Sequence, residues 1–169
     1  MKARGRSLVR AAVIAATASL AGALAGCGFR LEGRTVLPAA LMRPYIDAPD
    51  QQSDFAQSLR RDLLISGARP TTGPDRASAV IHVMDDHVSR RVLSVSATNQ
   101  PTEYLVTYTI RVTVSADGKQ LLPPQQLTDT RSYSFDESLL LAKEHEEAIL
   151  RGAMGRELAG IVMRRLGSL

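Results

Sequence analysis

Two short segments of this 169-residue chain combine histidine with carboxylates, the residue types that hold divalent metals or transfer protons. Residues 144–147 are Glu-His-Glu-Glu, but adjacent side chains on a helix do not converge on one point. His82 and His87 flank Asp85 and Asp86, and the alternation of a regular strand would place the two histidines on opposite faces. We therefore expect solvated polar segments at both places and no metal site.

No short catalytic motif is present in the sequence. It lacks the G-x-S-x-G elbow of serine hydrolases, the glycine-rich phosphate loop and the H-E-x-x-H motif of zinc proteases. Carboxylates that lie far apart in the sequence can meet in a folded protein, so a periplasmic hydrolase is one alternative. The sequence favours a protein that is not an enzyme and that uses no cofactor.

The only cysteine, Cys27, follows an N-terminal segment of the secretory type. Residues 1–10 carry four basic side chains, and residues 11–24 are uncharged but shorter than the roughly 20 apolar residues that span a bilayer. Residues 24–27 are Leu-Ala-Gly-Cys, which resembles the lipobox at which bacterial lipoproteins are cleaved and lipidated. Residues 23–25 also fit an ordinary Ala-x-Ala cleavage site, and a buried structural role for Cys27 is a second alternative.

These residues set the expected organisation of the chain. We expect residues 1–26 to be removed as a lipoprotein signal peptide and Cys27 to carry acyl chains, since two or more chains anchor a protein stably in a membrane. In bacterial lipoproteins an Asp at the next position marks retention at the inner membrane, so Gly28 favours the outer membrane. Residues 27–44 are expected to form a lipidated tether, and residues 45–169 a single domain.

The basic residues are concentrated at the N-terminus. The chain has 21 basic and 17 acidic residues, but residues 1–26 hold four of the basic ones and no acidic one. Residues 27–169 therefore carry equal numbers of each sign and have no formal net charge. This balance gives no support to nucleic acid as a partner.

The first half of the domain is expected to contain a short strand, a helix and a longer strand. Residues 45–47 are the short strand, and Ser53 can cap a helix over residues 54–66, which Gly67 ends. Apolar residues recur at every fourth position of that helix: Phe55, Leu59 and Leu63. Residues 79–95 are rich in valine and predict a strand, with a bulge at its Asp-Asp pair.

The second half begins with the most regular pattern in the sequence. Residues 103–115 alternate between two sets of side chains, which predicts a half-buried antiparallel strand. The set expected to face the core is Tyr104, Val106, Tyr108, Ile110, Val112 and Val114. Asp117-Gly118 predicts a hairpin turn, and Pro123-Pro124 is expected to interrupt the sheet, so that the last strand covers residues 127–135.

A helical period covers residues 138–166. Its apolar stripe consists of Leu150, Met154, Leu158, Ile161 or Val162, and Leu166. Gly152, Gly155 and Gly160 lose helix stability relative to alanine, which close approach of the helix to the sheet or to a partner would explain. The order strand, helix, three strands, helix predicts an α+β fold in which two helices cover one face of a four-stranded sheet.

Several short motifs, taken together and in order, resemble the LptE family of lipopolysaccharide-assembly lipoproteins. They are Cys27-Gly28-Phe29-Arg30-Leu31, Glu103-Tyr104 after a polar turn, Arg131-Ser132-Tyr133-Ser134-Phe135-Asp136, Leu141-Ala142-Lys143, and the helix end from Leu158-Ala159 to Arg165-Leu166. The resemblance covers nearly all of residues 27–169. It implies two helices packed on a four-stranded sheet, as the periodicities do.

The resemblance also implies a function. The protein would be lipid-anchored in the outer membrane, face the periplasm and the lumen of the LptD β-barrel, plug that barrel and help it to assemble. It would bind lipopolysaccharide for delivery to the outer leaflet. A lipoprotein subunit of another envelope machine, of the barrel-assembly or secretin-pilot type, is the alternative.

Candidate contacts to lipopolysaccharide follow from the resemblance. Lys143 lies at a basic position of the family, whereas the polar turn at residues 96–101, which holds the second basic position, contains no base here. The further candidates are Arg90, Arg91 and Arg131. Guanidinium groups bind phosphates through paired hydrogen bonds, and lipid A carries phosphates. Solvated surface charge, or pairing of Lys143 with Glu147 four residues later, is the structural alternative.

Overall fold

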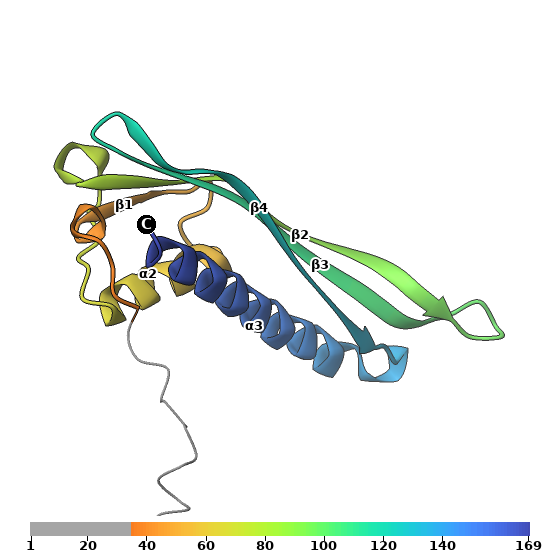
Figure 1. The fold of residues 1–169 in the computed structure, drawn as a ribbon. Coiled ribbons are helices and arrows are strands. Elements are labelled where there is room, and N and C mark those ends of the chain that lie inside the picture. The colour runs from red at the N-terminus through yellow and green to blue at the C-terminus, as the bar shows by residue number, and fades with distance from the viewer. Residues whose placement is uncertain (1–34) are drawn as a thin grey trace, which may run out of the picture. The chain divides into compact units, whose positions relative to one another are not determined.

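The computed structural model describes residues 35–169 (Figure 1). The predicted signal peptide, Cys27 and the first part of the predicted tether lie outside the described residues. In chain order the main elements are β1 (Pro44–Asp47), α2 (Asp54–Ile65), β2 (Ala79–Val95), β3 (Pro101–Ala116), β4 (Lys119–Ser134) and α3 (Leu140–Leu166). Short 3₁₀ turns precede β1, β2 and α3.

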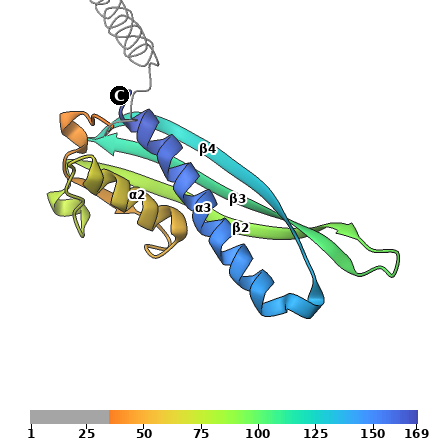
Figure 2. The same cartoon turned by 90° about the horizontal axis from the view of Figure 1, so that it is seen from below.

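The four strands form one sheet in the order β1-β2-β3-β4. β1 runs parallel to β2, and the other neighbours are antiparallel. Both helices lie on the same face of the sheet, which we call the inner face, and α3 runs along it beside α2 (Figures 1 and 2). The outer face carries no helix in the described part of the chain. The predicted α+β fold is thus confirmed.

The helix α2 forms where the sequence predicts it. The Ser53 hydroxyl accepts a hydrogen bond from the Ala56 amide and caps the first turn, and Gly67 adopts the positive φ that ends a helix. Its apolar stripe is fully buried: Phe55, Leu59 and Leu63. The packed core begins earlier in the chain than Tyr45, because Leu37 and Leu41, within the predicted tether, are buried in it.

A one-residue bulge in β2 changes which side chains face the helices. Val83 pairs with Val112, but Asp85 pairs with Arg111, so Met84 is the extra residue. A bulge of one residue shifts the alternation by one step. His82 and His87 therefore point to the same outer face, and the expectation of opposite faces is wrong.

The strand β4 is longer than predicted and runs through the two prolines. Pro123 and Pro124 lie at a register shift between the pairs Val112–Gln125 and Val114–Leu122. The sheet tolerates them because β4 is an edge strand, where an amide can be missing without loss of a ladder hydrogen bond. The expected start at residue 127 is therefore wrong. The predicted turn before β4 is confirmed, with positive φ at Asp117 and Gly118.

The close approach allowed by glycine is between the two helices, at Gly155. A Cβ atom there would lie 2.8 Å from the Cβ and 2.9 Å from the carbonyl carbon of Asp54, in the first turn of α2. The helices therefore touch through their backbones at this point. Gly160 has no such neighbour, because its Cβ would meet only the end of the flexible Arg164 side chain. Neither described helix is long and apolar enough to cross a membrane.

Candidate ligand-binding site

The stripe of α3 that faces the sheet changes chemistry along its length. Its C-terminal half is apolar and fully buried: Met154, Leu158, Val162 and Leu166. We call the contact of this half with the sheet the proximal interface. One, two and three turns before Met154 the helix carries the charged residues Arg151, Glu147 and Lys143. We give the name distal interface to these three residues together with the sheet residues Arg90, Tyr104 and Tyr133, to which Glu147 joins the helix.

Arg90 is the centre of the distal interface. Because of the Met84 bulge, it lies on the inner face, and its Nη1 donates a hydrogen bond of 2.7 Å to Glu147 Oε2. The same nitrogen lies 3.4 Å from the Tyr133 hydroxyl, which itself donates to Glu147 Oε2 at 2.7 Å. The guanidinium carbon lies 4.6 Å from the centre of the Tyr104 ring, a cation–π contact.

These contacts hold Glu147 in its ionised form. Partial burial by itself raises the pKa of the Glu147 carboxyl, but hydrogen bonds from Tyr133 and Arg90 and the charges of Arg90 and Arg151 more than offset burial, so its pKa is lowered. The hydrogen bond to Glu147 raises the pKa of Arg90 in turn. Burial and the adjacent Glu147 carboxylate raise the pKa of Tyr133. The interface therefore contains charged groups of both signs.

Lys143 joins the same interface one turn closer to the start of α3. Its Nζ donates to Glu146 Oε2 at 2.8 Å and lies 3.3 Å from the hydroxyl oxygen of Ser134, next to Tyr133. The pairing with Glu147 that the spacing suggested is not formed. Only 15% of the Lys143 side chain is exposed, so this ammonium lies against the end of β4 and does not extend into solvent.

The other two candidate bases lie elsewhere. Arg131 is on the inner face of β4, two residues before Tyr133, and its Nε donates to Asp129 Oδ2 at 3.0 Å. Arg91 pairs with Leu105 and points to the outer face. The structure thus places Arg90 and Lys143 along the first half of α3, on the neighbouring carboxylates Glu147 and Glu146. It leaves Arg131 with its own carboxylate on the inner face and puts Arg91 on the outer face.

Sequence reasoning missed Glu147, Tyr133 and Arg151 as members of the site. The signal for Glu147 and Arg151 was present, because positions 143, 147 and 151 recur every four residues and Arg151 lies three residues before Met154, on the same side of the helix. Tyr133 follows from the alternation of β4, since it pairs with the inward-facing Tyr104. What the sequence could not supply is the contact between β2 and α3, which lie 57 residues apart at Arg90 and Glu147.

An open hollow of about 580 Å³ lies beside the distal interface. Its wall is formed by the aromatic and apolar side chains of Tyr104, Phe135 and Leu140, by the carboxylates of Asp136 and Glu137, and by the turn between β2 and β3. Tyr104 stacks on Tyr133 and meets the ring of Phe135 edge-on. A ligand with both an anionic group and an apolar part would therefore find complementary surfaces side by side here.

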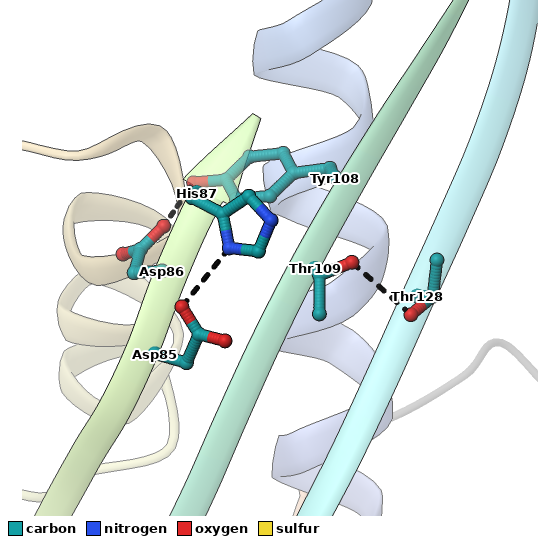
Figure 3. A network of polar contacts seen from close by, with 6 residues as sticks. All are labelled: Asp85, Asp86, His87, Tyr108, Thr109 and Thr128. Carbon is teal, nitrogen blue, oxygen red and sulfur yellow. Dashed lines mark hydrogen bonds and ion pairs between the residues drawn. The ribbon is translucent and has the colours of Figure 1, made fainter. Parts of the chain in front are cut away.

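A second polar group on the inner face joins α2 to the sheet. The Tyr108 hydroxyl donates to Asp86 Oδ1 at 2.8 Å (Figure 3). It also accepts a hydrogen bond of 3.1 Å from the Phe55 amide. The Ser53 hydroxyl donates to the other Asp86 oxygen. Burial raises the pKa of Asp86, and burial together with the Asp86 carboxylate raises that of Tyr108. This group satisfies the first turn of α2 and is structural.

The outer face is polar and open. His82 contacts Asp47 at 2.6 Å and His87 contacts Asp85 at 2.9 Å, as separate pairs. Within residues 35–169 no group of three or more His, Cys, Asp or Glu side chains could hold a metal ion. Most other outward positions of the long strands carry hydroxyl or amide groups: Ser89, Thr107, Thr109, Thr113, Gln126, Thr128, Thr130 and Ser132. Figure 3 shows Thr109 and Thr128 joined across two strands.

Comparison with protein families gives one match that covers most of the chain. The family described as LptE, lipopolysaccharide-assembly, matches residues 42–166. The LPS-assembly lipoprotein LptE of Pectobacterium atrosepticum is 27% identical over 143 residues, which cover 84% of this chain and 77% of the relative. The protein of the same name from Photorhabdus laumondii is 28% identical and covers 84% and 78%.

Solved structures share the fold. Lipoprotein B from Nitrosomonas europaea has a TM-score of 0.67 and 23% identity, over 83% of this chain and 91% of that one. Rare lipoprotein B from Shewanella oneidensis has a TM-score of 0.63 and 21% identity, over 75% and 94%. At these identities the likeness establishes the architecture: a four-stranded sheet with helices on one face.

Proposed function

Because the chain belongs to the LptE family of lipopolysaccharide-assembly lipoproteins, we propose that it plugs and helps to assemble the LptD β-barrel of the outer membrane. In this role it binds lipopolysaccharide and assists its delivery to the outer leaflet. It acts by binding and positioning, without catalysis. Cys27 carries the acyl chains that hold it at the membrane, with the domain facing the periplasm and the barrel lumen.

The contrast between the two faces of the sheet supports the role as a plug. The inner face is covered by α2 and α3, whereas the outer face presents hydroxyl and amide groups over three long strands. Barrel strands alternate apolar groups toward lipid with polar groups toward the lumen. A surface rich in hydrogen-bonding groups, among them a few charged ones such as Arg91 and Asp85, is complementary to such a lumen.

The distal interface supports lipopolysaccharide binding. Arg90 and Lys143 provide charged donors for the phosphates of lipid A, with Arg131 as a nearby third base. The adjacent hollow, with Tyr104 and Phe135 in its wall, suits the apolar part of the same molecule. This juxtaposition of cations and an aromatic wall is the observation on which ligand binding rests.

Affinity purification from detergent-solubilised outer membranes tests the plug. The protein should be recovered as a tight pair with LptD. Recovery with a different barrel or with a secretin would assign it to another envelope machine, and recovery as a lone species in every detergent and salt would contradict the proposal. Mass spectrometry of the mature N-terminal peptide should find acyl chains on Cys27, and Cys27→Ala should release the protein from the membrane.

Charge reversal tests the ligand site. Charge-assisted hydrogen bonds contribute about 1.5–3 kcal/mol each, so Lys143→Asp and Arg90→Asp should each weaken lipopolysaccharide binding by about ten- to a hundredfold. Arg91→Asp is the matched control, since it reverses the same charge one residue away on the outer face. A loss confined to Arg91→Asp would place the ligand on the outer face. LptD association should persist in all folded variants that keep the outer face intact.

A further inference from the structure

We infer that Glu147 is an internal competitor for the anion site of the distal interface, and that a bound phosphate group displaces its carboxylate. The anion site consists of Arg90, Tyr133 and Arg151. This inference rests on the proposed lipopolysaccharide binding for its physiological ligand, and adds to it a mechanism of regulation. In the unliganded protein the site is closed by the chain's own carboxylate.

The geometry around Glu147 is that of a bound anion. Two donors on different strands, Arg90 Nη1 and the Tyr133 hydroxyl, converge on the single oxygen Oε2, each at 2.7 Å. Phosphate oxygens accept the same donors at similar distances, and arginine binds both carboxylate and phosphate. A phosphate group could therefore take over these two hydrogen bonds, but only after Glu147 leaves.

The site also has more positive charge and more donors than Glu147 can satisfy. Arg90 and Arg151 both lower the pKa of Glu147 through their charge, so two cations act on one carboxylate. The Nε of Arg151 is buried and has no hydrogen-bond partner among the described residues. Buried donors are rarely left unpaired, so this nitrogen has a hydrogen-bonding capacity that the free protein does not use.

Displacement of Glu147 would loosen the beginning of α3. Over residues 140–151 three large apolar side chains of the helix are exposed, Leu140, Leu141 and Ile149, while Leu150 is partly buried against the core. The side-chain hydrogen bonds to the sheet in this stretch come from Glu147, to Arg90 and Tyr133, and from Lys143, to Ser134. From Met154 onward the helix is held by buried apolar contacts. Ligand binding should therefore free the first turns of α3 and leave the rest in place.

The alternative is that Glu147 has only a structural role, in which it joins α3 to β2. The two roles predict opposite effects of Glu147→Gln, which keeps the shape and removes the charge. If the role is structural, Glu147→Gln weakens the contact between α3 and β2 and leaves Arg90 less well placed, so ligand binding would stay equal or fall. A competitor would be removed, so binding of a phosphate group would become tighter.

The experiment measures binding of phosphorylated lipid A, dephosphorylated lipid A and inorganic phosphate to the full-length protein in detergent. Glu147→Gln should bind phosphorylated lipid A about tenfold more tightly, as expected if Glu147 vacates the site about a tenth of the time in the wild type. Affinity for dephosphorylated lipid A should not change. Glu144→Gln is the matched control, because it removes the same charge from an exposed position of the same helix.

Hydrogen exchange supplies a second readout. Phosphorylated lipid A should accelerate exchange of amides 140–151 in the wild type and leave amides 154–166 protected. Equal or weaker binding by folded Glu147→Gln, or an equal gain in Glu144→Gln, would overturn the inference while lipopolysaccharide binding stands. If the wild type binds no lipid A but Glu147→Gln gains affinity for inorganic phosphate, the competitor is supported and the proposed ligand is wrong. If neither protein binds any probe, both proposals fail.

Discussion

The proximal and distal interfaces are made by one helix on one sheet, yet they are built from different chemistry. At the proximal interface four side chains of α3 are fully buried in a core cluster shared with β2, β3 and α2. At the distal interface the corresponding positions are Arg151, Glu147 and Lys143, of which Glu147 and Lys143 reach the sheet through hydrogen bonds and an ion pair. Burial of a leucine contributes about 2 kcal/mol, whereas a partly exposed ion pair contributes about 0–1 kcal/mol. One half of α3 therefore holds the fold, and the other can change its contacts without unfolding it.

The largest difference between the two halves should come from the same substitution at each end of α3. Leu158 is fully buried and Leu141 is 81% exposed. Leu158→Ala should lower the free energy of unfolding by about 2–5 kcal/mol, because it removes buried methylenes and leaves a cavity. Leu141→Ala should change it by less than about 0.5 kcal/mol. Urea unfolding measures both, and similar losses would mean that the distal half is as firmly packed as the proximal half.

A glycine pair on α3 tests the backbone contact of the proximal half. Gly155→Ala should cost about 1–3 kcal/mol, because the new Cβ would overlap the backbone at Asp54 and force the helices apart. Gly160→Ala meets only the flexible end of Arg164 and should stabilise the protein by up to about 1 kcal/mol. Thermal and urea unfolding would show opposite signs. A gain in both variants would mean that the contact between α2 and α3 yields easily.

Removal of one hydroxyl from each of the two polar groups on the inner face gives a smaller contrast. Tyr108→Phe leaves the Phe55 amide without a partner and removes one of two donors from Asp86, which keeps the Ser53 hydroxyl, at an expected cost of about 1–2 kcal/mol. Tyr133→Phe removes one donor from Glu147, which keeps Arg90, so the cost should be below about 1 kcal/mol. Denaturant unfolding of the two variants measures the difference. A larger loss for Tyr133→Phe would reverse the order of the two groups.

The smallest effect is expected from acid. The folded pKa of Glu147 is lowered, so its contribution to stability is complete above the ordinary glutamate pKa of about 4.3 and is lost as pH falls through the folded value. The pKa of Asp86 is raised, so protonation of Asp86 on acidification favours the folded state. Protection of amides 140–151, relative to their intrinsic exchange rates, should therefore decrease below about pH 4, with a loss of less than about 1 kcal/mol. Glu147→Gln should remove this pH dependence, and its persistence there would implicate another group.

Periodic segments could be predicted from the sequence because their faces are set by burial alone. The strict alternation of β3 and the four-residue spacing in α2 gave the correct element, face and approximate ends. The prolines of β4 gave a wrong start, because tolerance of proline depends on whether a strand lies at the edge of the sheet. Whether a strand lies at an edge is a property of the sheet and not of the segment itself.

The candidate site was only partly predictable. Lys143 and Arg90 were named from a resemblance, but their partners depend on contacts between distant segments. The pair Arg90–Glu147 joins β2 to α3. Lys143 donates to Glu146 and not to Glu147, whose carboxylate already accepts hydrogen bonds from Arg90 and Tyr133. No local pattern distinguishes Arg90 from Arg91, and what separates them is the alternation after the Met84 bulge.

That bulge has a consequence in genetic terms. Deletion of the single codon for Met84 would remove the extra residue, and Asp85 and the residues after it would keep their partners and faces. Deletion of one residue between Met84 and Arg90 would instead turn Arg91 toward α3 and Arg90 outward. An insertion between Met84 and Arg90 would do the same unless a second change of length compensated for it. Which arginine contacts Glu147 therefore depends on the number of residues between the bulge and that position.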